Sequence, residues 1–128
     1  MILVRGRGEN NMESILRSVK KQIGLDPEYT QFDPDIIMSI NTVFVILNRV
    51  GVGPSTGFRI EDESAEWTDF LPDDDLNFDA VKTYIAAKVR LIFDPPTSSI
   101  VMQATKEVIA ELEWTLNINA ETSQSERG

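Results

Sequence analysis

The sequence contains no cysteine and no histidine. Without cysteine, disulfide bonds, thiolate nucleophiles and cysteine-ligated zinc are excluded. Without histidine, the chain lacks the usual general base near neutral pH and the commonest metal ligand. Carboxylate or lysine chemistry remains open in principle, but none of the 21 acidic residues has a neighbouring nucleophile or a recognisable spacing. We therefore predict that the protein is not an enzyme and has no catalytic, metal-binding or cofactor-binding residue.

Long apolar runs are also missing. No run approaches the roughly 20 residues that a membrane-spanning helix needs. The opening apolar stretch, Met1–Val4, is too short for a secretory signal, so neither export nor a membrane partner is expected. Met12 begins MESILRSVKKQIG, which is typical of a natural start. Residues 1–11 are thus either an extension that orders on a partner or a consequence of the choice of gene start.

Positive charge is scarce. The chain has 21 acidic and 12 basic residues, which gives a formal net charge of −9. A surface this acidic repels the phosphate backbone, so tight binding of DNA or RNA is not expected. The same charge is ordinary for a soluble bacterial or viral protein.

The spacing of the apolar residues predicts an all-α fold. At 128 residues, with 41% of them hydrophobic, the chain is long enough for one core. Apolar residues recur at three- and four-residue intervals and never switch to sustained alternation. We predict one domain over residues 12–119 and a flexible polar tail over residues 120–128. Its four main helices, in a small bundle, are expected at residues 12–23, 34–50, 76–93 and 97–119, and Asn11 is expected to cap the first.

The fourth predicted helix has more apolar residues than one buried face needs. One predicted core stripe consists of Val101, Ala104, Val108, Leu112 and Leu116. Four further large apolar residues lie off that stripe: Ile100, Ile109, Trp114 and Ile118. A helix that is apolar on more than one side is buried on more than one side, so a second chain is a candidate neighbour. Trp114 accordingly belongs either to the core or to an interface.

Residues 51–75 are predicted to form an irregular insertion between the second and third helices. Its GVGPSTG sequence lacks the Lys-Ser/Thr of a phosphate-binding loop and follows a helix, so it is interpreted as a helix terminator and turn. The run Asp73–Asp75 lacks the ligand spacing of a calcium loop and suits the positive end of the next helix. A connection this long is usually functional or mobile.

Three aromatic residues of this insertion stand among acidic residues: Phe58, Trp67 and Phe70. Residues 57–60 have weak strand character, and residues 67–71 have the pattern of a helical turn. Tryptophan is enriched at binding hot spots, so Trp67 packs either against its own domain or against another chain. These three residues and Trp114 are our candidate contacts with a partner protein.

A Pro-Pro corner separates the last two helices, where DAVKTYIAAKVRLIFDPP runs into SSIVMQATKEVIAELEWTLN. Asp94 precedes a proline and is pushed out of the α region, so the third helix must stop there. Proline is tolerated in the first turn of the next helix. The sequence therefore predicts a rigid corner, and Asp94, Pro95 and Pro96 are further candidate contact residues with a mainly structural role.

The corner also carries a family resemblance. AVKTYIAAKVRLIFDPPTSS, with NRVGVGP upstream and ELEWTLNINAE downstream, resembles the head–tail connector (head-completion or adaptor) proteins of long-tailed bacteriophages and prophages. The resemblance covers about residues 13–121. It implies a small helical subunit that assembles into a ring, typically twelve-fold, beneath the portal protein. Such a ring extends the DNA channel and docks the next component, a stopper or tail-completion protein.

The resemblance places the protein in the neck of the virion, after assembly in the cytoplasm of the host bacterium. It implies no cofactor and no specific DNA contact. The alternative is a cytoplasmic acidic helical adaptor or regulator that binds a single protein partner, with a surface that imitates nucleic acid. Assembly state separates the two, because a regulator is monomeric or dimeric and a connector forms a ring.

Overall fold

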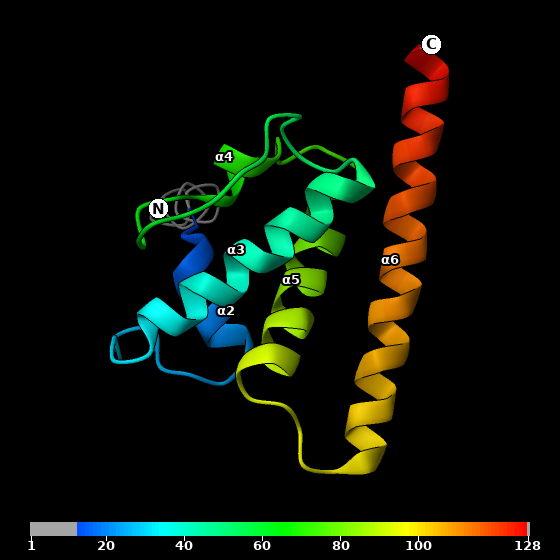
Figure 1. The fold of residues 1–128 in the computed structure, drawn as a ribbon. Helices are drawn as coiled ribbons and strands as arrows, with labels where there is room; N and C mark the ends of the chain where they lie inside the picture. Colours follow the sequence, from blue (N-terminus) through cyan, green and yellow to red (C-terminus); the bar gives the residue numbers. More distant parts are fainter. Residues whose placement is uncertain (1–12, 128) are drawn as a thin grey trace, which may run out of the picture.

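The computed structural model describes residues 13–127, with side chains described as far as Glu121. Within that range the helices are α2 (Ile15–Gln22), α3 (Asp33–Val50), α4 (Trp67–Phe70), α5 (Phe78–Phe93) and α6 (Ser99–Arg127), as Figure 1 shows. The described range holds no β-strand, and its one β-type pairing is an isolated bridge between Ser14 and Glu66. The predicted all-α class is confirmed, with a short helix, α4, inside the insertion.

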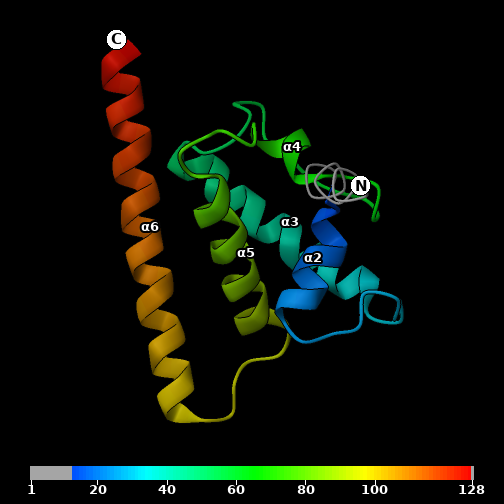
Figure 2. The same ribbon diagram turned by 180° about the vertical axis from the view of Figure 1, so that it is seen from behind.

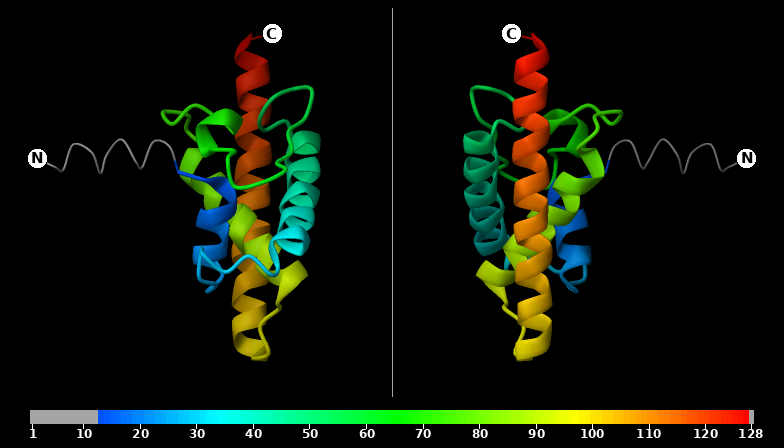
Figure 3. Two further views of the ribbon diagram at one scale, coloured as in Figure 1. Left: turned by 90° about the vertical axis from the view of Figure 1, so that its left-hand side faces the viewer. Right: turned by 90° about the vertical axis from the view of Figure 1, so that its right-hand side faces the viewer.

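The helices form a compact body with one long helix beside it. In Figures 1 and 2, α2, α3 and α5 lie together while α6 runs along one side and extends past both ends. The views in Figure 3 place α3 on one side of α6 and α2 with α4 on the other. Helix α6 contacts the body through α5 and α3. The arrangement is therefore a three-helix body with a flanking helix, and the predicted compact four-helix bundle is not confirmed.

Several helix ends follow from local sequence signals. Helix α3 has Pro34 in its first turn and ends at Gly51, whose φ of 99° is left-handed, as predicted. Helix α2 begins later than predicted, because the Ser14 hydroxyl accepts a hydrogen bond from the Arg17 N–H at 3.2 Å and acts as the N-cap. The predicted cap, Asn11, lies outside the described residues.

The last two helices differ from their predicted bounds. A turn delays the start of α5 to Phe78, because the Asp75 carboxylate accepts the Asn77 N–H at 2.7 Å and the Asp75 carbonyl accepts the Phe78 N–H at 3.0 Å. Helix α6 continues to Arg127 instead of ending near Asn119. Residues 120–127 contain no proline or glycine, so nothing in this polar stretch stops the helix.

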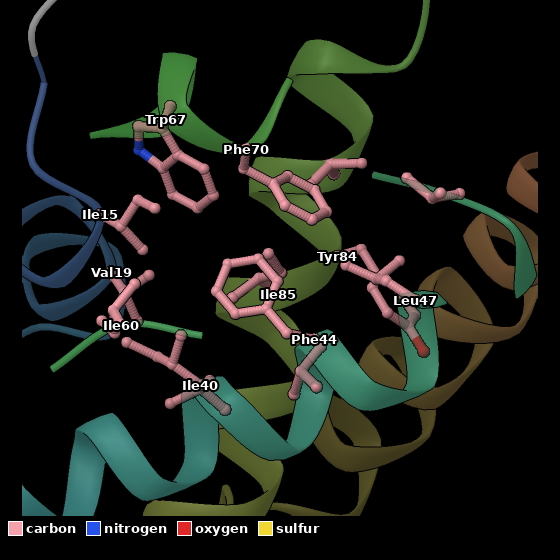
Figure 4. Close-up of a cluster of buried hydrophobic side chains, with 14 of the residues drawn as sticks. Ile15, Val19, Ile40, Phe44, Leu47, Ile60, Trp67, Phe70, Tyr84 and Ile85 are labelled. Atoms are coloured by element: carbon pink, nitrogen blue, oxygen red, sulfur yellow. The ribbon is translucent and has the colours of Figure 1, made fainter. Parts of the chain in front are cut away.

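The insertion closes one side of the core. The rings of Phe58 and Phe70 pack on Phe44 of α3, with centroids 5.0 and 4.7 Å away. Ile60 is buried, and the Asn41 side chain pairs with both its N–H (2.8 Å) and its carbonyl (2.9 Å). The weak strand predicted at residues 57–60 does not form, since these backbone groups bond to a side chain of α3. Figure 4 shows Phe70 and Ile60 of the insertion together with Phe44 and side chains of α2 and α5.

A glycine is required within this insertion. Gly53 has a φ of 92°, and a Cβ atom placed on it would collide with the Phe70 ring. The turn predicted for GVGPSTG is therefore also the site of a close approach between backbone and core.

Two polar contacts tie α2 into the body. The Trp67 indole N–H donates to the Ser18 hydroxyl at 2.7 Å, and both residues are buried. The Lys20 ammonium is also buried, and it donates to the Asp33 carboxylate at 2.8 Å and to the Pro27 carbonyl at 3.0 Å. A buried charge needs such partners, so this pair fixes how the connection after α2 meets the start of α3.

Helix α6 is attached mainly along its middle part, residues 109–120. Ile109, Leu116 and Ala120 are buried against the body. The Tyr84 hydroxyl donates to the Glu113 carboxylate at 2.8 Å, and Asn119 donates to Asn77 at 2.7 Å. Burial raises the pKa of the Tyr84 phenol, and the hydrogen bond to Glu113 raises it further.

The two tryptophans provide a matched test of the core. Replacing Trp67 by Ala opens a cavity and is expected to lower the free energy of unfolding by about 3–5 kcal/mol. Replacing the exposed Trp114 by Ala is expected to change it by less than about 0.5 kcal/mol. Urea unfolding followed by circular dichroism measures both, and similar losses for the two variants would contradict the packing described for Trp67.

The bond between Tyr84 and Glu113 predicts a pH dependence. The pKa of Tyr84 is higher in the folded than in the unfolded chain. The neutral phenol therefore contributes fully to the free energy of unfolding below the unfolded pKa of about 10, and this contribution is lost as the pH rises above that value. Tyr84→Phe is expected to cost about 1 kcal/mol at pH 7. Urea titrations between pH 7 and 11.5 should show a smaller alkaline loss for the variant, and parallel curves would contradict this.

Candidate protein-interaction surface

The face of α6 turned away from the body carries several exposed large apolar residues, with Glu107 and Glu111 among them. At 3.6 residues per turn, Ile100, Trp114 and Ile118 lie within about 40° of one another and opposite Ile109 and Leu116. Their exposed fractions are 80%, 67% and 38%. An α-helix in a monomeric domain normally presents polar residues on this side. We call these three residues, with Val101 and Val108 beside them, the outer face of α6.

This outer face extends around one side of the helix. Val101 and Val108 are 48% and 46% exposed, and Ala104 between them is exposed as well. The predicted core stripe was wrong for these residues, because Ile109 takes the buried position. Glu107 and Glu111 are exposed and lie in the same angular range as Ile100, Trp114 and Ile118, so the apolar outer face contains two acidic residues. Exposed apolar surface that runs along several turns is typical of a protein contact.

A second open apolar surface lies on α3. The first two thirds of this helix, far from α6 in Figure 1, borders a hollow of about 420 Å³. Met38 and Val45 line it and are each 69% exposed. The two apolar surfaces therefore lie on different sides of the molecule.

The aromatic candidates from the insertion lie in or against the core. Trp67 and Phe70 are 3% and 5% exposed, and Phe58 is half-buried against Phe44. Of the two alternatives for Trp67, the structure shows packing against its own domain. These side chains hold the insertion to the body, so their surroundings do not support a direct contact with a partner. Trp114 has the opposite placement and is not a core residue.

The candidates at the corner lie in the connection that reverses the chain between α5 and α6. Asp94 leaves the helix with φ −152° and ψ 73°, and Arg90 Nε donates to its carbonyl at 2.9 Å. Asp94 and Pro95 are exposed, and Pro96 is half-buried. The Ser98 hydroxyl then accepts the Val101 N–H at 3.3 Å, so α6 begins at Ser99 and runs antiparallel to α5 (Figure 1). The corner thereby sets the position of the outer face.

The described residues offer surfaces for association. Among them, no group of His, Cys, Asp or Glu is arranged to hold a metal ion. Every buried polar side-chain atom of that part has a hydrogen-bond partner. No helix in residues 13–127 is both long and apolar enough to cross a membrane.

The sequence signal for the outer face was the surplus of apolar residues in the last helix. The spacing of these residues did not show which face of the helix is buried and which is exposed.

One known protein family matches most of this chain. A family model described as phage connector protein matches residues 15–123, which include all the described helices except the last residues of α6. No curated protein and no solved structure gives a significant match. The match covers most of the chain, including the insertion, the Pro-Pro corner and the outer face of α6. The resemblance seen in the sequence is confirmed, and the chain belongs to the phage connector protein family.

Proposed function

We propose that the protein is a structural head–tail connector that forms a ring beneath the portal, extends the DNA channel and docks the next neck or tail component. Membership of the phage connector family supports a role at the junction of head and tail. The observation that carries the proposal is the outer face of α6, where Trp114 is 67% and Ile100 80% exposed. A subunit that worked alone would gain nothing from this apolar surface.

Lateral contact between subunits is assigned to the outer face of α6. Burying apolar surface contributes roughly 25 cal/mol per Å², and large aromatic residues dominate such contacts. The face is on one side of the molecule, so its contact with a different surface of the next copy is heterologous. A heterologous contact closes into a ring when the rotation between copies divides the circle.

Axial contacts with the portal and the next component are assigned to the ends of α6. Helix α6 extends beyond the body at both ends in Figure 1, with the corner residues Asp94 and Pro95 exposed at one of them. The chain carries a net charge of −9, which disfavours tight contact with phosphates. DNA would thus pass through such a ring without specific binding.

Trp114→Glu tests the lateral contact. A carboxylate buried in an apolar interface without a partner is costly, so the expected loss is at least about 2 kcal/mol per contact. The variant should stay folded by circular dichroism but lose rings in negative-stain electron micrographs of the protein co-expressed with its portal. Thr68→Glu introduces the same charge at an exposed position of α4 and should leave the rings intact.

Rings that persist in Trp114→Glu would contradict the assignment of the lateral surface but not the connector function. The function itself is tested with the unmodified chain. Rings stacked coaxially on the portal would support it. A monomer by light scattering that ignores the portal under several conditions would contradict it and favour a regulator that binds a single partner.

A further inference from the structure

An apolar groove runs between α3 and the insertion. It consists of two hollows, of about 420 and 380 Å³, which share Pro34 and Ile37 as lining residues. Met38 and Val45 line the first hollow, and Leu16 of α2 lines the second. We call the two together the α3 groove. Its apolar lining at one end and its long open shape suit an extended peptide more than a compact ligand.

The second hollow has an acidic rim. Glu61, Asp62 and Glu63 line it from the insertion, and Asp33 lines it from α3. Glu61 pairs with Arg59 at 3.1 Å and Glu63 with Arg17 at 3.6 Å, all on exposed side chains. Asp62 takes part in no ion pair within the described part of the chain, and hydrogen bonds from Ser64 lower its pKa. This rim can therefore accept a further cationic group.

The N-terminal segment of the chain joins the fold beside this rim. The Glu13 carbonyl accepts the Trp67 N–H at 3.2 Å, and the Ile15 N–H donates to the Ala65 carbonyl at 2.9 Å. Leu16, which lines the second hollow, follows directly. Residues 1–12 are thus tethered at the acidic end of the groove. Twelve residues reach up to about 40 Å when extended, which is ample for the length of the groove.

The order of residues in the segment matches the order of surfaces in the groove. Moving away from the tether, the segment presents Arg7 and Arg5 and then the apolar run Val4, Leu3 and Ile2. In the same direction, the groove presents first its acidic rim and then the hollow with Met38 and Val45. The first hollow is also lined by Asn41, Thr42 and Arg59, and Arg59 pairs with Glu61. The acidic rim thus faces the two arginines of the segment, and Met38 and Val45 face its apolar run.

We propose that Ile2–Arg7 binds in the α3 groove of its own chain, with Arg5 and Arg7 against the acidic rim and the apolar run against Met38 and Val45. The tether favours the same chain over a second copy, because it gives the segment an effective concentration in the millimolar range. This inference does not depend on the connector function. It gives residues 1–11 a role, as an extension that orders on the body of the protein.

The test uses a fluorescently labelled peptide of residues 1–12 and two full-length proteins. One is the unmodified chain, and the other carries Ile2→Ser, Leu3→Ser and Val4→Ser, which removes its own competing segment. The triple variant is expected to bind the peptide, and the unmodified chain is expected to bind it at least tenfold more weakly. Fluorescence anisotropy measures both affinities on free subunits, without portal.

Substitutions in the triple variant locate the site. Met38→Glu with Val45→Glu should weaken peptide binding at least tenfold, and Asp62→Lys should weaken it several-fold and reduce its dependence on salt. Leu76→Glu, at an exposed apolar position that lines neither hollow and lies outside α6, is the matched control and should leave the affinity unchanged. Met38 and Val45 are exposed, so circular dichroism should show that these variants stay folded.

Three results would overturn the inference. The first is that the triple variant does not bind the peptide, and the second is that both full-length proteins bind it equally well. The third is that the unmodified chain is a dimer by light scattering and becomes a monomer in the triple variant, which would show binding to a second copy. The same experiments leave the connector proposal untouched, because that proposal is read out on rings with the portal.

Discussion

The packing of the insertion against α2 and α3 is the constraint on which the rest of the structure depends. The Trp67 indole lies on the side of the core that Ile15 and Val19 of α2 line (Figure 4). Its N–H donates to the Ser18 hydroxyl. The Phe44, Phe58 and Phe70 rings pack against one another on the other side of the insertion. Without these contacts the three-helix body would expose its core on one side. The insertion is thus a structural layer, and only its rim is free to bind.

The sequence predicted the parts of the fold that depend on local signals. Each of three local signals restricts the backbone. Pro34 stands in the first turn of α3, Gly51 ends α3, and the Pro-Pro corner ends α5. The predicted end of α6 near Asn119 was wrong. Residues 120–127 are polar, but they contain no proline or glycine that would stop the helix. The strand character of residues 57–60 was misleading, since Asn41 is far away in sequence and its bonds to Ile60 cannot be seen in a local pattern.

The candidate site was predictable only in part, because burial depends on tertiary packing. Trp67 and Trp114 both lie in segments rich in acidic residues, yet one is buried and the other is 67% exposed. A long insertion with many acidic residues gave no sign that its aromatic side chains point inward. In α6, Val108 and Ile109 are neighbours of similar hydropathy, and only the position of α5 decides which one is buried. The surplus of apolar residues in this helix was nevertheless a correct sign of a second surface.

Helix α6 has a mechanical consequence for the molecule. Its 29 residues form one unbroken helix, which at 1.5 Å per residue is about 43 Å long. It packs against the body along residues 109–120, and its first turns lead back to a corner with two prolines. A force applied to one end of α6 is therefore transmitted to its other end by a continuous helix, whereas a loop would absorb it. Helix α6 is thus a stiff strut that couples the two ends of the molecule.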